Sequence, residues 1–179
     1  MLARLLALVL IMIATPAAAR PLDWSAVPLP KLEGGAFSAD AFAGKVVLVV
    51  NTASFCGFTK QYSGLEDLWA RHHDGGFVLL GVPSNDFGAQ EPGSSGEIKA
   101  FCETTFGIDF PMLAKQAVVG ADAHPLYRWA AQQDAAAMPK WNFHKLLIGR
   151  DGTLLASFPS AAEPTGPEVT QAVDAALAR

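Results

Sequence analysis

The stretch KVVLVVNTASFCGFT, residues 45–59, decides the fold. Its first half is a run of β-branched and aliphatic residues, which is typical of a parallel strand buried on both faces. Apolar residues then recur at helical spacing over residues 59–73, and a second apolar run follows at residues 77–82. A strand, a helix and a second strand of these lengths predict a right-handed βαβ unit.

The segments after this unit add helices and a β-hairpin. Helical patterns, with capping residues at their ends, occupy residues 94–106, 124–133 and 168–177. Strands at residues 143–148 and 153–158 flank an Asp-Gly turn, which is a strong hairpin signal. The sequence therefore predicts an α/β protein with a thioredoxin-like fold, in which helices flank a central mixed β-sheet.

Residues 1–19 have the layout of a secretory signal peptide. Arg4 precedes an unbroken apolar run at residues 5–14, and small residues before and at Ala19 offer a cleavage site. The run is too short to span a bilayer, so a retained anchor is the less favoured alternative. We expect residues 20–179 to form a single exported domain, periplasmic or secreted after cleavage, without stable membrane insertion.

Composition excludes several classes of protein. A length of 179 residues suits one domain with a sizeable core, and an apolar fraction of 51% excludes a disordered chain. The formal net charge of −4 argues against nucleic-acid binding. With 2 cysteines and 4 histidines at no close spacing, the chain is neither a disulfide-dense miniprotein nor an expected metal site.

Cys56 is the sharpest single feature of the sequence. It lies between the first strand and the following helix, so we expect its thiol at a helix N-terminus, where unpaired N–H groups favour a thiolate. Gly57 permits another molecule to approach the sulfur. On position alone, a small buried filler is an equally good interpretation. Thr59 stands where a C-x-x-C motif would carry its second cysteine, which disfavours a dithiol exchange site.

Three motifs occur in order along the chain. They read NTASFCGFT at residues 51–59, VPSNDFGAQEPG at residues 82–93, and WNFHK at residues 141–145 followed shortly by GRDG. Together they resemble the signatures of the glutathione peroxidase family, and the resemblance spans roughly residues 25–179. It implies a peroxidase that reduces hydrogen peroxide and organic or lipid hydroperoxides.

The resemblance also implies a catalytic set of Cys56, Gln90, Trp141 and Asn142. A thiolate must attack one peroxide oxygen while the other leaves as an alcohol or alkoxide. The amide and indole N–H groups of the other three residues can donate to the charge that develops. The cysteine thus becomes a sulfenic acid, and no cofactor is expected beyond an external thiol reductant.

Three residues depart from the family pattern. Phe55 precedes the nucleophile, where the family often has a basic residue, so one source of thiolate stabilisation is missing. Asp86 stands where the family commonly has glutamine and adds a negative charge near the site. Ser84 replaces a cysteine that is frequent in relatives.

Cys102 lies in the predicted helix at residues 94–106, before the pair Phe110 and Pro111. In the cysteine-based, thioredoxin-reduced branch that the chain resembles, a resolving cysteine occupies the matching helix. The resemblance implies that the Cys56 sulfenic acid condenses with Cys102. The resulting disulfide would be reduced by a thioredoxin-like dithiol or, as the less favoured donor, glutathione. Local unwinding of the helix is expected, because a disulfide needs Cα atoms within about 7 Å.

Other interpretations stay open at this stage. The two cysteines could form a permanent structural bridge, or the chain could be an exported, non-catalytic redox sensor or binding protein with a Cys56–Cys102 disulfide. A Cys–His hydrolase that pairs Cys56 with His144, with His124, or with one of the adjacent His72 and His73 is disfavoured, because the resemblance explains Cys56 without a histidine. The short connection between Tyr127 and Trp141 indicates that the long loop of tetrameric relatives is absent, which favours a monomer with an open site.

Overall fold

The computed structural model describes residues 20–179, so the expected signal peptide at residues 1–19 lies outside the described residues. The described chain is built on a 4-stranded sheet with the order β2-β1-β3-β4. The central strand β1 pairs in parallel with β2 and antiparallel with β3, and β3 pairs antiparallel with β4. This is the mixed sheet that the sequence predicts. The strands are β1 (Val46–Thr52), β2 (Phe77–Pro83), β3 (Lys145–Ile148) and β4 (Leu154–Phe158).

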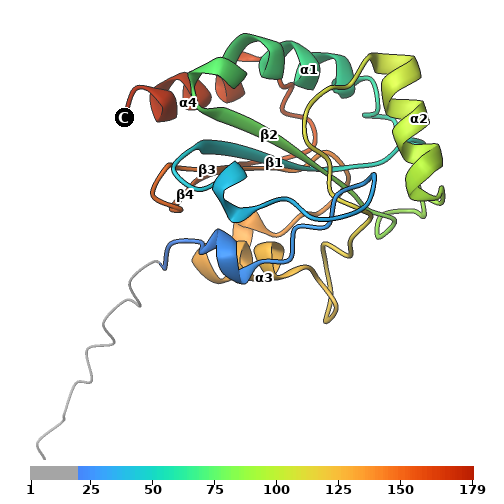
Figure 1. The fold of residues 1–179 in the computed structure, drawn as a ribbon, viewed down its shortest axis with the longest axis horizontal. Coiled ribbons are helices and arrows are strands. Elements are labelled where there is room, and N and C mark those ends of the chain that lie inside the picture. Colours follow the sequence, from blue (N-terminus) through green and yellow to red (C-terminus); the bar gives the residue numbers. More distant parts are fainter. Residues whose placement is uncertain (1–19) are drawn as a thin grey trace, which may run out of the picture.

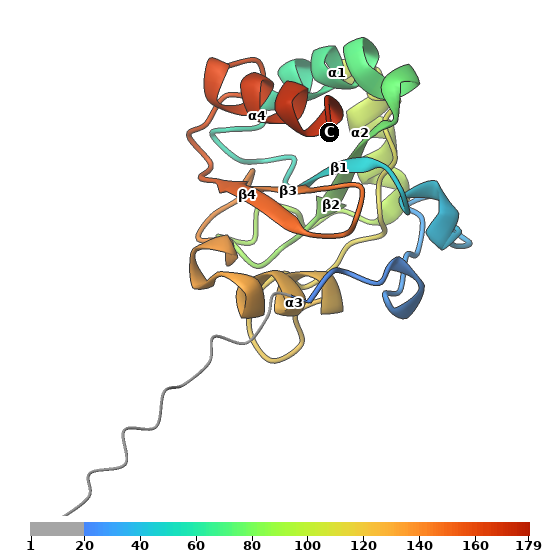
Figure 2. The same cartoon turned by 90° about the vertical axis from the view of Figure 1, so that its left-hand side faces the viewer.

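Helices cover both faces of the sheet (Figures 1 and 2). α1 (Gln61–His72) and α4 (Pro167–Leu177) lie on one face, and α3 (Pro125–Gln133) lies on the other. α2 (Ser95–Phe106) lies beside α1 at one end of the sheet. Within residues 20–179, no helix is both long and apolar enough to cross a membrane.

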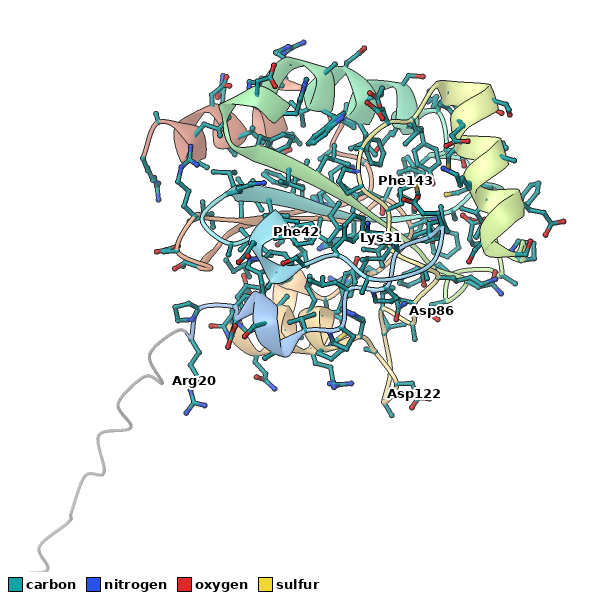
Figure 3. The ribbon with its side chains drawn as sticks, viewed as in Figure 1. Arg20, Lys31, Phe42, Asp86, Asp122 and Phe143 are labelled. Carbon is teal, nitrogen blue, oxygen red and sulfur yellow. The ribbon has the colours of Figure 1, made fainter. Side chains whose placement is uncertain are left out.

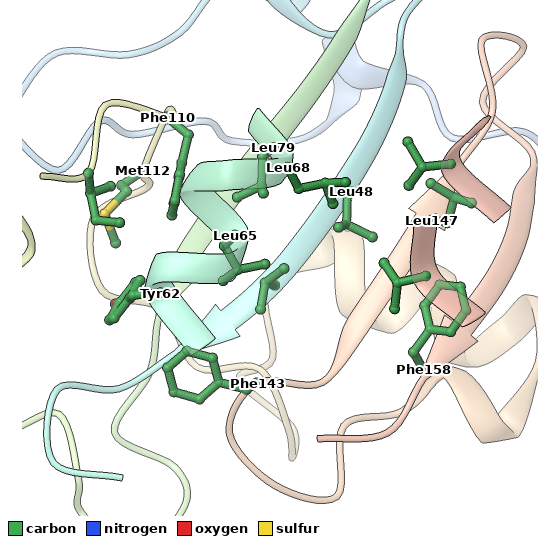
Figure 4. Packing of buried hydrophobic residues seen from close by; sticks show 14 of the residues in the cluster. Leu48, Tyr62, Leu65, Leu68, Leu79, Phe110, Met112, Phe143, Leu147 and Phe158 are labelled. Atoms are coloured by element: carbon green, nitrogen blue, oxygen red, sulfur yellow. The ribbon is translucent and has the colours of Figure 1, made fainter. Parts of the chain in front are cut away.

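The core has two layers, one on each face of the sheet. Alternate residues of β1 point to opposite faces, so Leu48 joins the cluster under α1 and α4 while Val49 joins the cluster over α3. Figure 4 shows Leu48 in the first cluster together with Leu65, Leu68 and Leu79. All of β1 is buried, which explains why its sequence is a continuous apolar run.

Helix α2 begins and ends where its capping residues predict. The Ser94 side chain accepts from the N–H of Glu97, and the Glu97 carboxylate accepts from the N–H of Ser94. The helix ends at Gly107, whose φ of 66° is in the left-handed region that favours glycine. These two ends fix the position of Cys102 on the helix.

The third strand begins two residues later than the sequence predicts. Phe143 was expected to be its first residue, but its φ is 64° and β3 starts at Lys145. The Phe143 N–H donates to the carbonyl of Asn51 at 2.6 Å, and its buried ring meets that of Tyr62 edge-on at 5.4 Å (Figures 3 and 4). An apolar side chain that is buried in a turn gives the same sequence signal as one in a strand.

Candidate active site

Cys56 lies in a tight turn between β1 and α1. Its N–H donates to the Thr59 hydroxyl at 3.0 Å, and that hydroxyl donates to the Ala53 carbonyl at 2.8 Å. The N–H of Phe58 lies 3.4 Å from the Cys56 sulfur and donates to it. The helix begins only at Gln61, later than residue 59. The expectation that the thiol lies at the helix N-terminus was therefore wrong in detail, because an N–H group of the preceding turn faces the sulfur.

Two further loops bring the expected donor residues together. The Asn142 amide donates to the Gln90 side-chain oxygen at 2.9 Å and to the Phe87 carbonyl at 3.3 Å. The Trp141 ring lies against the Phe87 ring, with 5.8 Å between centroids, and remains 39% exposed. The main-chain carbonyl of Gln90 accepts from the N–H of Phe55, the neighbour of Cys56, at 3.0 Å. Segments far apart in the sequence thus converge beside the Cys56 turn.

The turn that carries Trp141 and Asn142 is fastened to the central strand. The Asn51 amide donates to the Trp141 carbonyl at 3.0 Å, and the Asn51 carbonyl accepts from Phe143. Left-handed backbone at a bulky residue such as Phe143 is strained and persists only where its surroundings hold it. Since Asn51 lies near the end of the strand that leads to Cys56, one strand end positions both Cys56 and the turn of Trp141 and Asn142.

Lys145 lies beneath this turn and is fully buried. Its ammonium group donates to the Gln61 side-chain oxygen at 2.7 Å and to the Phe143 carbonyl at 2.8 Å. Burial lowers the pKa of Lys145 to about 8, against the opposing charges of Glu163 and Glu168. A buried cation is costly unless it is hydrogen-bonded, so these acceptors fix the ammonium group against the strained turn.

Lys145→Met is expected to give a stability difference that depends on pH. Below pH 8 the folded and unfolded wild-type chains both hold the proton, so the wild type carries the full cost of burying the charge. Between about pH 8 and 10.5 the folded chain has lost this proton while the unfolded chain still holds it. The free energy of unfolding of the wild type therefore increases as pH rises through this range. Relative to the wild type, the free energy of unfolding of the variant should therefore fall by on the order of 3 kcal/mol over this range.

Urea unfolding at pH 7 and pH 10 measures this change. Lys140→Met is the matched control, because Lys140 is exposed and should give a difference that does not vary with pH. A Lys145→Met difference that stays constant between the two pH values would contradict the assignment of a buried charge.

The departures from the family pattern differ in their consequences. The Asp86 carboxylate, labelled in Figure 3, accepts from the N–H groups of Val118 and Val119 at 2.6 and 3.1 Å, so main-chain donors stabilise its charge. Ser84 is buried and accepts from the Asp86 N–H at 3.4 Å. Phe55 leaves 69% of its surface exposed, so the basic position of the family is here an apolar group at the surface.

The histidines do not pair with Cys56. His144 is buried rather than at the surface, and burial lowers its pKa to about 4. Among the described histidines, none hydrogen-bonds to Cys56, so the structure gives no support to a Cys–His hydrolase. Within the same residues, no group of three or more His, Cys, Asp or Glu side chains is arranged to hold a metal ion. The other histidines, His72, His73 and His124, contact Asp174, the Trp69 carbonyl and the Pro28 carbonyl.

Cys102 lies on the buried face of α2, with only 1% of its surface exposed. Its thiol and that of Cys56 are both free, and both residues belong to the same apolar cluster. Burial raises the pKa of Cys102 to about 11, so this thiol is protonated at neutral pH.

Two hollows flank the Cys56 turn. One, of about 310 Å³, lies between the turn and α2, and its lining includes Ser54, Phe55, Glu91, Ile98 and Phe101. The other, of about 420 Å³, lies beside Trp141 and is mostly apolar. Its lining includes Phe58, Trp141, His144, Pro159 and Ala161.

The chain matches known proteins over most of this architecture. The model of the family described as glutathione peroxidase matches residues 25–131, more than half of the chain. The hydroperoxy fatty acid reductase gpx1 of Synechocystis sp. is 48% identical over 142 residues, which are 74% of this chain and 84% of the relative.

Solved structures agree with this match. The apo crystal structure of Trgpx has a TM-score of 0.71 and 34% identity, and the match covers 90% of this chain and 98% of that one. A thioredoxin-family interchange protein from Chlorobium tepidum, at 18% identity, has a TM-score of 0.63 and covers 90% of this chain and 99% of its own. This second likeness confirms the thioredoxin-like fold. With the family model and the cyanobacterial relative, these observations show that the chain belongs to the glutathione peroxidase family.

Proposed function

We propose that the chain is a thiol peroxidase in which Cys56 reduces hydrogen peroxide and organic or lipid hydroperoxides. The observation that carries this proposal is the convergence of Gln90, Trp141 and Asn142 on the turn that holds a free Cys56 thiol. Family membership supports it. The printed name of the cyanobacterial relative, a hydroperoxy fatty acid reductase, supports a lipid-derived substrate.

The geometry suits attack by sulfur on oxygen. The Cys56 thiolate attacks the terminal oxygen of the hydroperoxide, so an S–O bond forms while the O–O bond breaks. The leaving oxygen takes the proton of the former thiol and departs as alcohol or water, which leaves a sulfenic acid. Because the Gln90 side-chain oxygen already accepts from Asn142, the Gln90 amide N–H groups are the part of this side chain that can donate to a peroxide. The Trp141 indole supplies a second donor that cannot accept.

Trp141→Phe isolates the contribution of the indole N–H. The phenyl ring can keep the contact with Phe87 but cannot donate to the leaving oxygen. We expect the rate constant of peroxide reduction to fall by about 10²-fold, the usual loss when one such donor is removed. The measurement is stopped-flow consumption of peroxide by the reduced protein in a single turnover.

Trp129→Phe is the matched control for this change. The Trp129 indole donates to the Arg20 carbonyl at 2.7 Å, so the variant loses an indole hydrogen bond outside the candidate site. Equal rates for the two variants would contradict the role of Trp141.

The proposal includes a resolving role for Cys102 and regeneration by a dithiol protein. Its buried, protonated thiol suits a residue that reacts only after Cys56 has been oxidised. The chain shows no clear counterpart of the basic cluster that binds glutathione in tetrameric relatives. A steady-state assay that compares a thioredoxin-type dithiol with glutathione, on hydrogen peroxide and lipid hydroperoxides, tests both points. Turnover that glutathione supports and the dithiol does not would contradict both points.

We further propose that the protein is exported, cleaved near Ala19, and monomeric. The layout of residues 1–19 and the short connection before Trp141 support these proposals. The apolar hollow beside Trp141 supports access for bulky hydroperoxides. N-terminal sequencing of the mature protein and light scattering on a sizing column would test cleavage and assembly.

A further inference from the structure

Buried polar groups with poorly satisfied hydrogen bonds gather beneath the helix that carries Cys102. The Thr52 hydroxyl, the Tyr62 hydroxyl and one carboxylate oxygen of Glu91 are buried and form no hydrogen bond that satisfies normal geometry. The Tyr62 hydroxyl lies within reach of the Thr52 hydroxyl and the Cys102 thiol, and burial together with the charges of Cys102 and Glu91 raises its pKa. Buried polar groups are rarely left unpaired, and such a cluster in a native fold calls for an explanation.

Glu91 is the charged member of this cluster, and the residue is fully buried. One carboxylate oxygen accepts from the Ser54 hydroxyl at 3.2 Å, while the other has no partner. Burial raises the pKa of Glu91. Lys115, the cation whose charge acts on Glu91, donates to the main-chain carbonyls of Glu91 and Gly93 at 3.1 and 2.7 Å rather than to the carboxylate. Glu91 therefore keeps a free acceptor site inside the protein.

The position of Glu91 is between the two cysteine-bearing segments. Its hydrogen-bond partner Ser54 lies two residues before Cys56. Glu91 also lines the 310 Å³ hollow together with Ile98 of α2. Ile98 and Cys102 are one helical turn apart and are the buried residues of that helix. Glu91 thus lies against the buried face of α2 that carries Cys102, and its charge raises the pKa of that thiol.

We propose that Glu91 is the base that removes the proton from Cys102 when that thiol attacks the oxidised nucleophile. This inference rests on the resolving role proposed above for Cys102. The free carboxylate oxygen of Glu91 takes the thiol proton, and the Cys102 thiolate attacks the sulfur of the Cys56 sulfenic acid. The S–S bond forms as the S–O bond breaks. The departing hydroxide receives the proton from Glu91 and leaves as water, which returns the carboxylate to its starting form.

Because of the charges around Cys102, a base and a merely charged neighbour have opposite effects on the rate of disulfide formation when they are removed. The thiol is faced by Tyr62 of α1, by Glu91 and by Glu103 of its own helix, and both carboxylates raise its pKa. A hollow on the other side of Cys102 is lined by Glu33, Lys99 and Asp109 in addition to Glu103. If Glu91 acted only through its charge, its removal would make the thiol easier to ionise and would speed disulfide formation. A base has the opposite effect when it is removed.

Glu91→Gln is the decisive variant, because glutamine keeps the size of the side chain and an acceptor for Ser54. Reduced protein is mixed with one equivalent of hydrogen peroxide, quenched with an alkylating reagent and analysed by mass, so that sulfenic acid and disulfide are followed separately. We expect disulfide formation to slow by about 10²-fold at pH 7, a typical loss for a general base. The slowed rate should then rise about tenfold per pH unit toward the pKa of the Cys102 thiol, which in this variant lies below the wild-type value of about 11 because the Glu91 charge is gone.

Two more variants complete the experiment. Glu91→Asp keeps the carboxylate and should retain part of the rate with a flat pH profile, which separates loss of the base from loss of packing. Glu103→Gln removes the other neighbouring carboxylate, which is exposed and bound to Lys99, and should leave the rate equal or slightly faster.

The outcomes separate this inference from the proposed function. A Glu91→Gln rate that is equal to or faster than that of the wild type, with disulfide formed normally by the wild type, would overturn the role of Glu91 alone. A wild-type chain that consumes peroxide but forms no Cys56–Cys102 disulfide would overturn the resolving role of Cys102, and the role of Glu91 with it.

Discussion

Cys56→Ser is expected to reduce peroxide consumption to the uncatalysed rate. The serine hydroxyl stays protonated at neutral pH, and among the described residues no histidine hydrogen-bonds to this position to activate it. The donors Gln90 and Trp141 would still be present, but they can act only after a nucleophile has attacked. Peroxide consumption by stoichiometric reduced protein, followed by stopped flow, measures the loss.

The fold should survive this substitution, because only one atom changes in a residue that is 9% exposed. Matching circular dichroism spectra and urea midpoints for the variant and the wild type provide the control. Full activity in Cys56→Ser would show that the nucleophile has been assigned to the wrong residue.

Cys102→Ser is expected to stop turnover while sparing the first reaction. The reduced variant should consume one equivalent of peroxide at a rate close to that of the wild type, since Cys102 lies on α2 rather than in the Cys56 turn. Without the second thiol, no intramolecular disulfide forms, so a thioredoxin-type dithiol loses its substrate. Steady-state turnover with that reductant should fall by more than about 10²-fold, the scale of loss when an essential group is removed.

Unchanged turnover in Cys102→Ser would contradict the resolving role and leave this cysteine as a core residue. The same assay separates a peroxidase from a redox sensor with the same pair of cysteines. A sensor reacts about stoichiometrically, whereas a peroxidase continues to consume peroxide as long as reductant is in excess. Loss of multiple turnovers in the wild type would therefore favour the sensor.

The elements with strong local signals were predictable from the sequence. The apolar run at residues 45–51 predicted β1 to within one residue, because a strand buried on both faces has almost no polar residue to interrupt it. The capping pair Ser94 and Glu97 predicted the start of α2, and Gly107 predicted its end. These signals depend on neighbours in the sequence, so they can be interpreted without a tertiary structure.

Features that depend on distant partners could not be predicted in the same way. Phe143 adopts a left-handed conformation because Asn51 and Lys145 hold its backbone, and neither contact leaves a local pattern. Lys145 is buried because Gln61, from another segment, accepts its hydrogen bond. A lysine is ordinarily expected at the surface, so burial was not predictable.

The candidate site shows the same division. Cys56 stood out from its position, but only the family resemblance linked Gln90 with Asn142, which are 52 residues apart and hydrogen-bonded in the structure. Glu91 was missed altogether. Its only signal in the sequence is a charged residue inside a motif beside Gln90, and its burial becomes visible only when α2 and the Cys56 turn are placed around it.

The most direct test of the proposed peroxidase cycle is to map the thiols before and after one equivalent of hydrogen peroxide. We expect Cys56 and Cys102 both to be free in the reduced protein. After peroxide they should be joined in one disulfide, which a thioredoxin-type dithiol reopens. Two thiols that remain free while the peroxide persists would contradict the peroxidase assignment. A disulfide that is present from the start and resists a dithiol protein would instead identify the pair as a structural bridge.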